Sequence, residues 1–185
     1  MRRLILAMAV SIDGFAAGPG GVMDWHAPPG EDGSGDRRQR GYVELAAQCG
    51  LIVLGGHAGQ EMATAWPGSE SPMGVLMNTL PKRVFSSSAD GIDWSNATVS
   101  QGAIEDEIPE LKREPGKDIV CFGGASFARA LAAAGLIDEY RLTVHPVVLG
   151  EGVPLLHGLP EPQRLRFVGS TTYSDGVAIH EYATP

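Results

Sequence analysis

Cysteine is scarce in this chain of 185 residues, in which Cys49 and Cys121 are the two examples. Both lie in or beside apolar segments, and two thiols are too few for a disulfide-stapled exported scaffold. We therefore expect two buried, reduced thiols. No apolar stretch is long enough to span a bilayer, and Ser11, Asp13 and Gly14 interrupt the apolar N-terminal run too early for a typical signal peptide. These features predict a cytoplasmic protein without a membrane partner.

Positive charge is also scarce. Lys and Arg number 14 against 22 Asp and Glu, the formal net charge is −8, and the basic residues form no run. Because nucleic acid is bound by basic surfaces, we expect no nucleic-acid partner. The histidines have neither metal-ligand spacing nor cysteine companions, which predicts no metal site. They are His26, His57, His145, His157 and His180.

Two catalytic signatures are missing as well. The chain has no Gly-x-Ser-x-Gly elbow and no Walker-type glycine loop. The usual sequence evidence for a hydrolase or a phosphoryl-transfer enzyme is therefore absent. The pattern that remains suits a cofactor enzyme, because a cofactor brings its own reactive atom.

The clearest element that is present is the segment Gly116–Tyr140, which is typical of a strand, a glycine turn and a helix. Ile119–Phe122 is a continuous apolar run, as a strand covered on both faces requires. Gly123–Gly124 ends this strand, and Ser126 is the expected cap of the helix that follows. That helix carries an apolar stripe at helical spacing and ends at Gly135, its expected C′ residue.

Comparable patterns extend along the chain, for which we expect one α/β domain over residues 1–185. Expected strands cover residues 4–10, 51–54, 83–85, 96–99 (an edge strand), 119–122 and 140–148, with a closing hairpin over 164–173 and 177–182. Expected helices run from Asp36 as N-cap to Cys49, from Ala58 to Trp66, from Ser71 as N-cap to Leu80, over 104–111 around Pro109, and from Ser126 to Ala134.

Residues Phe15–Gly35 form a glycine- and proline-rich segment around the apolar island VMDWHAP. The segment is too long for a simple connection, and loops of this kind often act as lids. The residues Met73, Leu76, Met77 and Leu80 follow helical spacing instead. We interpret this methionine-rich face as core rather than as part of a cofactor site.

Glycine pairs stand at the ends of two expected strands, at Gly55–Gly56 and at Gly123–Gly124. Parallel strands bring their carboxyl ends to one edge of a sheet, where ligands bind in open α/β folds. Paired glycines let the backbone approach a ligand closely, and a helix that follows offers free N–H groups to an anion. The repeated pattern favours a dinucleotide site, with tight turns in ordinary α/β units as the alternative.

Two further polar positions follow expected strands. Ser86, Ser87 and Ser88 could bind a phosphate or a ribose, or could form a solvated turn. Asp13 could contact a ligand, or could hydrogen-bond the backbone of its own turn.

With these pieces in place, the chain resembles the dihydrofolate reductase-like superfamily, in the branch of the C-terminal reductase domain of bacterial riboflavin biosynthesis. The resemblance rests on AMAVSIDGF, VMDW, LIVLGG, PKRVFSSS, the long run from IVCFGGAS through DEY to HPVVLGEG, and the closing hairpin that ends in Tyr182. It implies a three-layer α/β/α domain with a central mixed sheet and a C-terminal β-hairpin. It also implies NADPH as cofactor, with NADH possible, a small heterocyclic substrate such as a pterin or pyrimidine, and a homodimer.

The same resemblance implies roles for individual residues. Residues that would hold the pyrophosphate and nearby ribose are Gly123, Gly124, Ala125, Ser126 and Phe127, and residues near the adenosine phosphate are Ser86 and Ser87. The second phosphate turn would comprise Gly55, Gly56, His57 and Ala58, and residues around the nicotinamide and the substrate would be Ala9, Met23, Trp25 and Thr143. Independently of the resemblance, Asp13 or Asp24 could position a proton-donating water, with Asp24 as a loop cap as the alternative.

The chain departs from the family pattern at two places. Gly56 and Ala58 stand where the family usually has an arginine and a threonine. A lost guanidinium removes ~1.5 to 3 kcal/mol of charge-assisted bonding, so weaker NADPH binding, a switch to NADH and loss of the cofactor stay open unless His57 or Arg83 compensates. The acidic group that orients a pterin has no clean match: Gly30 falls near its position, and the residues around it are Asp24, Glu31, Asp32 and Asp36.

Three functional hypotheses follow from these residues. The first is a nicotinamide-dependent reductase. The second is a ligand-binding protein that has kept the fold without turnover, which the glycine and alanine of the second turn motivate. The third is a cofactor-independent enzyme of specialised metabolism that uses the same pocket.

Overall fold

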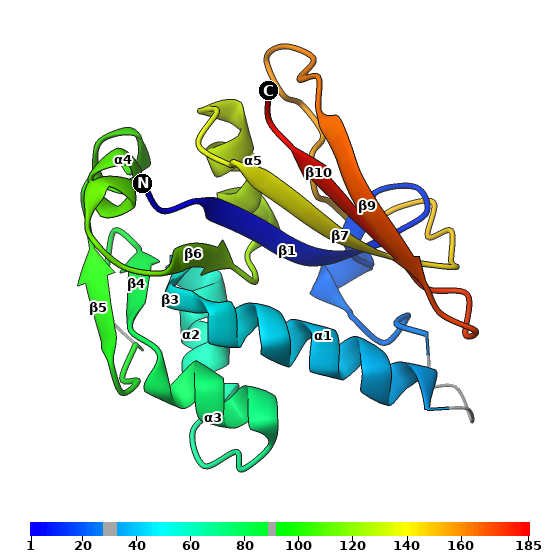
Figure 1. Ribbon diagram of the computed structural model, residues 1–185, viewed down its shortest axis with the longest axis horizontal. Coiled ribbons are helices and arrows are strands. Elements are labelled where there is room, and N and C mark those ends of the chain that lie inside the picture. Colours follow the sequence, from blue (N-terminus) through cyan, green and yellow to red (C-terminus); the bar gives the residue numbers. More distant parts are fainter. Residues whose placement is uncertain (28–32, 89–91) are drawn as a thin grey trace.

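The computed structural model describes residues 1–27, 33–88 and 92–185 (Figure 1). Gly30, Glu31 and Asp32, which we considered for a pterin-orienting group, lie outside the described residues. The strands are β1 (Leu4–Ser11), β2 (Phe15–Ala17), β3 (Cys49–Gly55), β4 (Lys82–Phe85), β5 (Ala97–Ser100), β6 (Asp118–Cys121), β7 (Glu139–His145), β8 (Val153–Pro154), β9 (Arg166–Thr172) and β10 (Ala178–Ala183). The helices are α1 (Ser34–Gln48), α2 (Gly56–Ala65), α3 (Pro72–Thr79), α4 (Ile104–Arg113) and α5 (Ala125–Ala133), with a 3-10 turn η1 (Pro19–Gly21).

The main sheet is mixed and has eight strands in the order β5-β4-β3-β6-β1-β7-β10-β9. The strands from β5 to β7 pair in parallel, whereas β10 runs antiparallel to both β7 and β9. The hairpin of β9 and β10 ends the sheet on one side, and β5 is the other edge. The expected mixed sheet, C-terminal hairpin and edge strand near residues 96–99 are therefore confirmed.

Alternation along β1 divides the core between the two faces of the sheet. Leu4, Leu6 and Met8 pack with buried residues of α4 and α5. Ile5 and Ala7 pack on the opposite face with buried residues of α1, α2 and α3. Because a strand points successive side chains to opposite faces, an apolar run like this one must be covered on both sides. Figure 1 shows the resulting three layers, with helices on both sides of the sheet.

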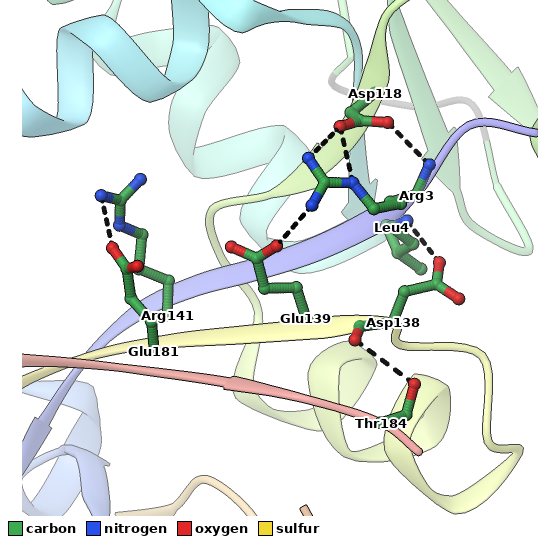
Figure 2. Close-up of polar contacts among 8 residues, drawn as sticks. All are labelled: Arg3, Leu4, Asp118, Asp138, Glu139, Arg141, Glu181 and Thr184. Carbon is green, nitrogen blue, oxygen red and sulfur yellow. Dashed lines mark hydrogen bonds and ion pairs between the residues drawn. The ribbon is translucent and has the colours of Figure 1, made fainter. Parts of the chain in front are cut away.

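Charged residues tie together the ends of the strands that lie opposite the glycine turns (Figure 2). Arg3 donates to Asp118 at the start of β6, at 2.6 and 3.0 Å, and to Glu139 at the start of β7, at 2.9 Å. The Asp138 carboxylate accepts the Leu4 N–H at 2.7 Å. These bonds fix the positions of three neighbouring parallel strands relative to one another along the strand direction. The bond to Asp138 also satisfies the Leu4 N–H, which the strand end would otherwise leave unpaired.

Two helix ends, the start of α3 and the end of α5, lie where their capping residues predict. Ser71 accepts a hydrogen bond from the Gly74 N–H, as an N-cap should, and α3 begins at Pro72. Gly135 has φ +66° and follows α5, where its N–H and that of Leu136 bond to carbonyls of the last turn. This is the Schellman arrangement for which glycine at C′ is favoured.

Several expected element boundaries were wrong. Cys49 begins β3 rather than ending the preceding helix, and Asp36 lies in the first turn of α1 rather than at its N-cap, which is Gly33. Ser126 is not the cap of α5, because Gly124 occupies that position with no side-chain cap. The segment after Gly14 is also less loop-like than expected, since β2 pairs with β8 in a second, two-stranded sheet.

Both cysteines are buried and free, as expected. Burial raises the pKa of the Cys49 thiol to about 11 and that of Cys121 to about 12, so both stay protonated at neutral pH. In the ranges that the structure describes, no helix is long and apolar enough to cross a membrane.

Candidate functional site

The two glycine turns lie side by side. The parallel strands β3 and β6 are neighbours, so their carboxyl ends reach the same edge of the sheet. A Cβ atom added to Gly124 would lie 3.8 Å from the Gly55 backbone nitrogen and 3.4 Å from the Ala58 Cβ. Gly55 is the last residue of β3 and Gly56 the first of α2, so the strand passes directly into the helix without a separate loop.

Part of the reason for these glycines is packing. A Cβ on Gly55 would lie 2.7 Å from the Phe127 Cβ, and one on Gly56 would lie 2.6 Å from the Ser86 Oγ. The Phe127 side chain is 8% exposed and stacks on Phe85, with ring centroids 5.4 Å apart. It belongs to the core, so Phe127 can offer a ligand only its backbone.

The start of α5 presents backbone groups instead of side chains. Gly124 has φ +87°, which a residue with a Cβ rarely adopts. The first intrahelical bond is donated by Ala128 to the Gly124 carbonyl, which leaves the N–H groups of Ala125, Ser126 and Phe127 without a helical acceptor. An anion placed here would meet those N–H groups and the positive end of the helix dipole.

The two side chains that could compensate for the missing cation, Arg83 and His57, each lie beside a glutamate. The Arg83 guanidinium lies 3.4 Å from the Glu107 carboxylate, with which it pairs. The His57 side chain is 85% exposed and lies 3.3 Å from Glu61 of the next helical turn. Ser87 is exposed, and Ser86 Oγ accepts the Ser88 N–H at 3.3 Å.

A cavity of about 220 Å³ opens beside the glycine turns. Its lining comes from β1 and β2, from α1, α2 and α3, from the residues that follow β6 and α2, and from the loop after η1. The lining residues are Ala7, Met8, Ala9, Ala16, Met23, His26, Tyr42, Met62, Trp66, Met73, Met77 and Phe122. Met62 also borders the turn, because a Cβ on Gly123 would lie 2.8 Å from the Met62 Cε.

The methionine face of α3 belongs to the core, as expected, because Met77 is buried and Met73 packs against the same core cluster. Both side chains also line the cavity. Five of the six methionines of the chain do so. The clustering of Met62, Met73 and Met77 after the first glycine turn was the available signal, since methionine is common at adaptable binding surfaces.

Thr143 lies next to Ala9 in the register of β1 and β7, which places both expected residues together. Thr143 is buried, and its hydroxyl is 2.5 Å from that of Tyr42 on α1. Burial raises the pKa of Tyr42, so its hydroxyl stays protonated. Sequence reasoning used Tyr42 only as a helix core residue, because nothing in its spacing indicates a partner on a distant strand.

Met23 and Trp25, which we expected together around the nicotinamide and the substrate, have different surroundings in the structure. Met23 lines the cavity, whereas Trp25 packs edge-on against His26 and His145, with ring centroids at 4.6 and 5.5 Å. The Trp25 indole nitrogen is buried and has no hydrogen-bond partner among the described residues. His145 Nδ1 accepts the Ala27 N–H at 2.9 Å. The neutral form of the imidazole therefore anchors this loop.

The two candidate acids differ. Asp13 accepts hydrogen bonds from the Ser11 hydroxyl at 2.6 Å and from the N–H groups of Leu149 and Gly150 at 3.1 and 2.7 Å. The Ser11 bond is the main cause that lowers the pKa of Asp13 to about 2. These contacts favour a structural role for Asp13, which follows β1 and holds the loop after β7 in place. Asp24 is exposed on the loop. Within the described ranges, no cluster of His, Cys, Asp or Glu could hold a metal ion.

Comparison with known proteins agrees with this architecture. The protein YyaP of Bacillus subtilis, which is described as uncharacterized, is 34% identical over 181 residues, 95% of this chain and 92% of that protein. A protein of Shewanella sp. PV-4, provisionally described as a riboflavin biosynthesis protein, has a similar fold, with a TM-score of 0.79, 23% identity and coverage of 100% and 99% of the two chains. Dihydrofolate reductase from Enterococcus faecalis, solved with NADP(H), gives a TM-score of 0.65 at 16% identity, with 98% and 96% coverage. Residues 2–179 match the model of the RibD C-terminal domain, and the chain therefore belongs to that family.

Proposed function

We propose that the protein is an NAD(P)H-dependent reductase that transfers hydride to a C=N or C=O bond of a small heterocyclic compound. The observation that carries this proposal is the position of Met62, which borders both the Gly123 turn and the cavity. A dinucleotide held at the turns would thus end beside the cavity. The family and the fold are those of reductases, and a protein of similar fold was solved with NADP(H).

The residues at the turns fit a dinucleotide pyrophosphate. Gly123 and Gly124 pack so closely on Met62 and Ala58 that a Cβ on either would lie 2.8 or 3.4 Å from these side chains, and the free N–H groups of α5 supply donors without a charged side chain. The bound cofactor supplies the hydride. The protein's part is to hold the substrate ring against the wall of the cavity, to exclude water from it, and to fix its orientation near the hydroxyl pair of Tyr42 and Thr143.

Replacing Gly124 by alanine should weaken NADPH binding by about tenfold or more. The new methyl group would lie between the two turns, 3.4 Å from Ala58 and Phe127, and alanine is strained at φ +87°, so the N–H groups at the start of α5 should shift away from the pyrophosphate. Gly135→Ala is the matched control, because Gly135 also has positive φ, lies at the other end of α5 and has nothing within 4 Å of its added Cβ. Both variants should lose about 1 to 2 kcal/mol of stability, because alanine is strained at positive φ. Quenching of tryptophan fluorescence during NADPH and NADH titrations measures the affinity, and equal affinities for the two variants would contradict the assignment of the turn.

A ligand-binding protein without turnover is the second candidate. It is favoured by the second turn, where Gly56 and Ala58 supply no cation and where Arg83 is already paired with Glu107. Mixing the protein with NADPH and a panel of quinones and pterins separates the two candidates. Oxidation of NADPH that depends on the protein and on the acceptor supports the reductase, whereas saturable acceptor binding without oxidation supports the binding protein.

A further inference from the structure

The cavity beside the glycine turns is lined without charge in the part of the chain that the structure describes. Five methionines reach it, and Trp66 and Phe122 complete an apolar wall. None of the described lining residues is Asp, Glu, Lys or Arg. Its volume of about 220 Å³ lies below the ~300 to 1,000 Å³ of pockets for drug-sized molecules, so the ligand is small.

A charged ligand would be poorly stabilised in this cavity. A phosphate group or a protonated ring placed against these methionines would lose water and gain no counter-charge. Burial of an uncompensated charge is strongly unfavourable, and in proteins such groups are paired or neutralised instead. The lining therefore selects against sugar phosphates and against cationic bases.

The polar groups at the cavity are neutral and few. Tyr42 lines it and shares a hydrogen bond with Thr143, which ties α1 to β7 at this point. His26 lies on the loop side, and burial, followed by the nearby charge of Arg38, lowers its pKa. A hydroxyl and an uncharged imidazole can bind one or two carbonyl, hydroxyl or ring-nitrogen atoms.

Methionine favours a flat aromatic occupant. Its unbranched side chain adapts to irregular shapes, and its sulfur makes favourable contacts with aromatic rings. Met62 lies on α2 and Trp66 is the C-cap residue one turn later, whereas Met73 and Met77 lie one turn apart on α3. Three methionine side chains and one indole ring therefore line the cavity from these two helices.

We propose that this cavity binds an uncharged planar ring compound that carries no phosphate, such as a neutral quinone or an uncharged bicyclic heterocycle. The compound would accept the hydride together with one proton from solvent water, so that the reduced product is also neutral, and in that respect the inference rests on the proposed reductase function. The preference for an uncharged ring does not depend on turnover.

Three naphthalenes that share one ring system and differ in charge test the preference. They are 2-naphthol, which is neutral at pH 7, the anion 2-naphthoate, and the cation 2-naphthylmethylammonium. Calorimetric titration of the full chain without any nicotinamide should show 2-naphthol binding about tenfold or more tightly than either ion. Comparable or tighter binding of an ion would overturn the proposal, as would the absence of 2-naphthol binding.

A substitution inside the cavity tests its location. Met73→Glu places a carboxylate among the lining residues and should reverse the order, so that the cation binds better than 2-naphthol. Val75→Glu is the matched control on the same helix, because Val75 is 50% exposed and does not line the cavity. Circular dichroism establishes that both variants are folded. Unchanged selectivity in folded Met73→Glu would assign the binding to another site and overturn the proposal.

The two proposals fail separately. The naphthalene titrations contain no cofactor, so a selective 2-naphthol site can exist even if NADPH does not bind, which would refute only the reductase. Conversely, NADPH binding and oxidation with a charged acceptor preferred would leave the reductase intact and refute the preference for an uncharged ring.

Discussion

Replacing Arg38 by methionine is expected to lower the free energy of unfolding by about 3 kcal/mol. Arg38 on α1 donates to Asp175 in the turn between β9 and β10, and their side chains are 12% and 5% exposed. Methionine keeps most of the length of the side chain and removes its charge, which leaves a buried carboxylate without its partner. Removing one member of a buried ion pair costs about 3 to 5 kcal/mol, and we take the lower end because the Val177 N–H still bonds Asp175.

Urea denaturation of the wild type and the variant at pH 7 measures this loss. Arg40→Met is the control, since Arg40 lies on the same helix and is exposed. It should change stability by less than about 0.5 kcal/mol. The double variant Arg38→Met with Asp175→Asn should recover part of the loss, because the remaining group is no longer charged. Equal midpoints for Arg38→Met and Arg40→Met would show that the buried pair contributes nothing.

Lowering the pH from 7 to 4.5 is expected to reduce stability by about 2 to 3 kcal/mol through His145. Burial is the main cause that lowers its pKa from 6.5 to about 4, and the nearby His26 and Arg38 act in the same direction. The unfolded chain therefore takes up a proton at a higher pH than the folded chain. The stability contributed by neutral His145 is complete above pH 6.5 and is lost as the pH falls toward 4.

His145→Asn should flatten this pH dependence, because an asparagine oxygen can accept the Ala27 N–H without titrating. The free energy of unfolding should be measured at several pH values between 7 and 4.5. This range stays above the region where Asp13, Asp118 and Asp175, whose pKa values are lowered, lose their charge. His57→Gln, at an exposed position, should keep the wild-type slope. A wild-type slope in His145→Asn would mean that another group carries the effect.

Local patterns were enough to predict the main architecture. The apolar run from Leu4 is buried on both faces by alternation, and Gly135 ends α5 with positive φ. Each of these signals lies within a few residues of the feature that it indicates, and the pairing of the glycine turns follows from parallel strands. Local alternation also predicted the closing hairpin, and family resemblance added the three-layer arrangement around a mixed sheet.

Features that depend on distant partners could not be predicted. The bond between Tyr42 and Thr143 joins residues 101 positions apart, and that between Arg38 and Asp175 spans 137 positions. The short strand β2 pairs with β8, far along the chain, and its three residues carry no strand pattern of their own. At Cys49 the apolar spacing of α1 continues into β3, so periodicity alone could not place the boundary.

The methionine lining of the cavity has a consequence for oxidative damage. Hydrogen peroxide converts methionine to its sulfoxide, which is polar and chiral. Met23 on the loop is 53% exposed and would react before the buried Met77. A mildly oxidised protein would therefore present a more polar wall to its ligand while its core stayed packed, and methionine sulfoxide reductases could restore the original surface.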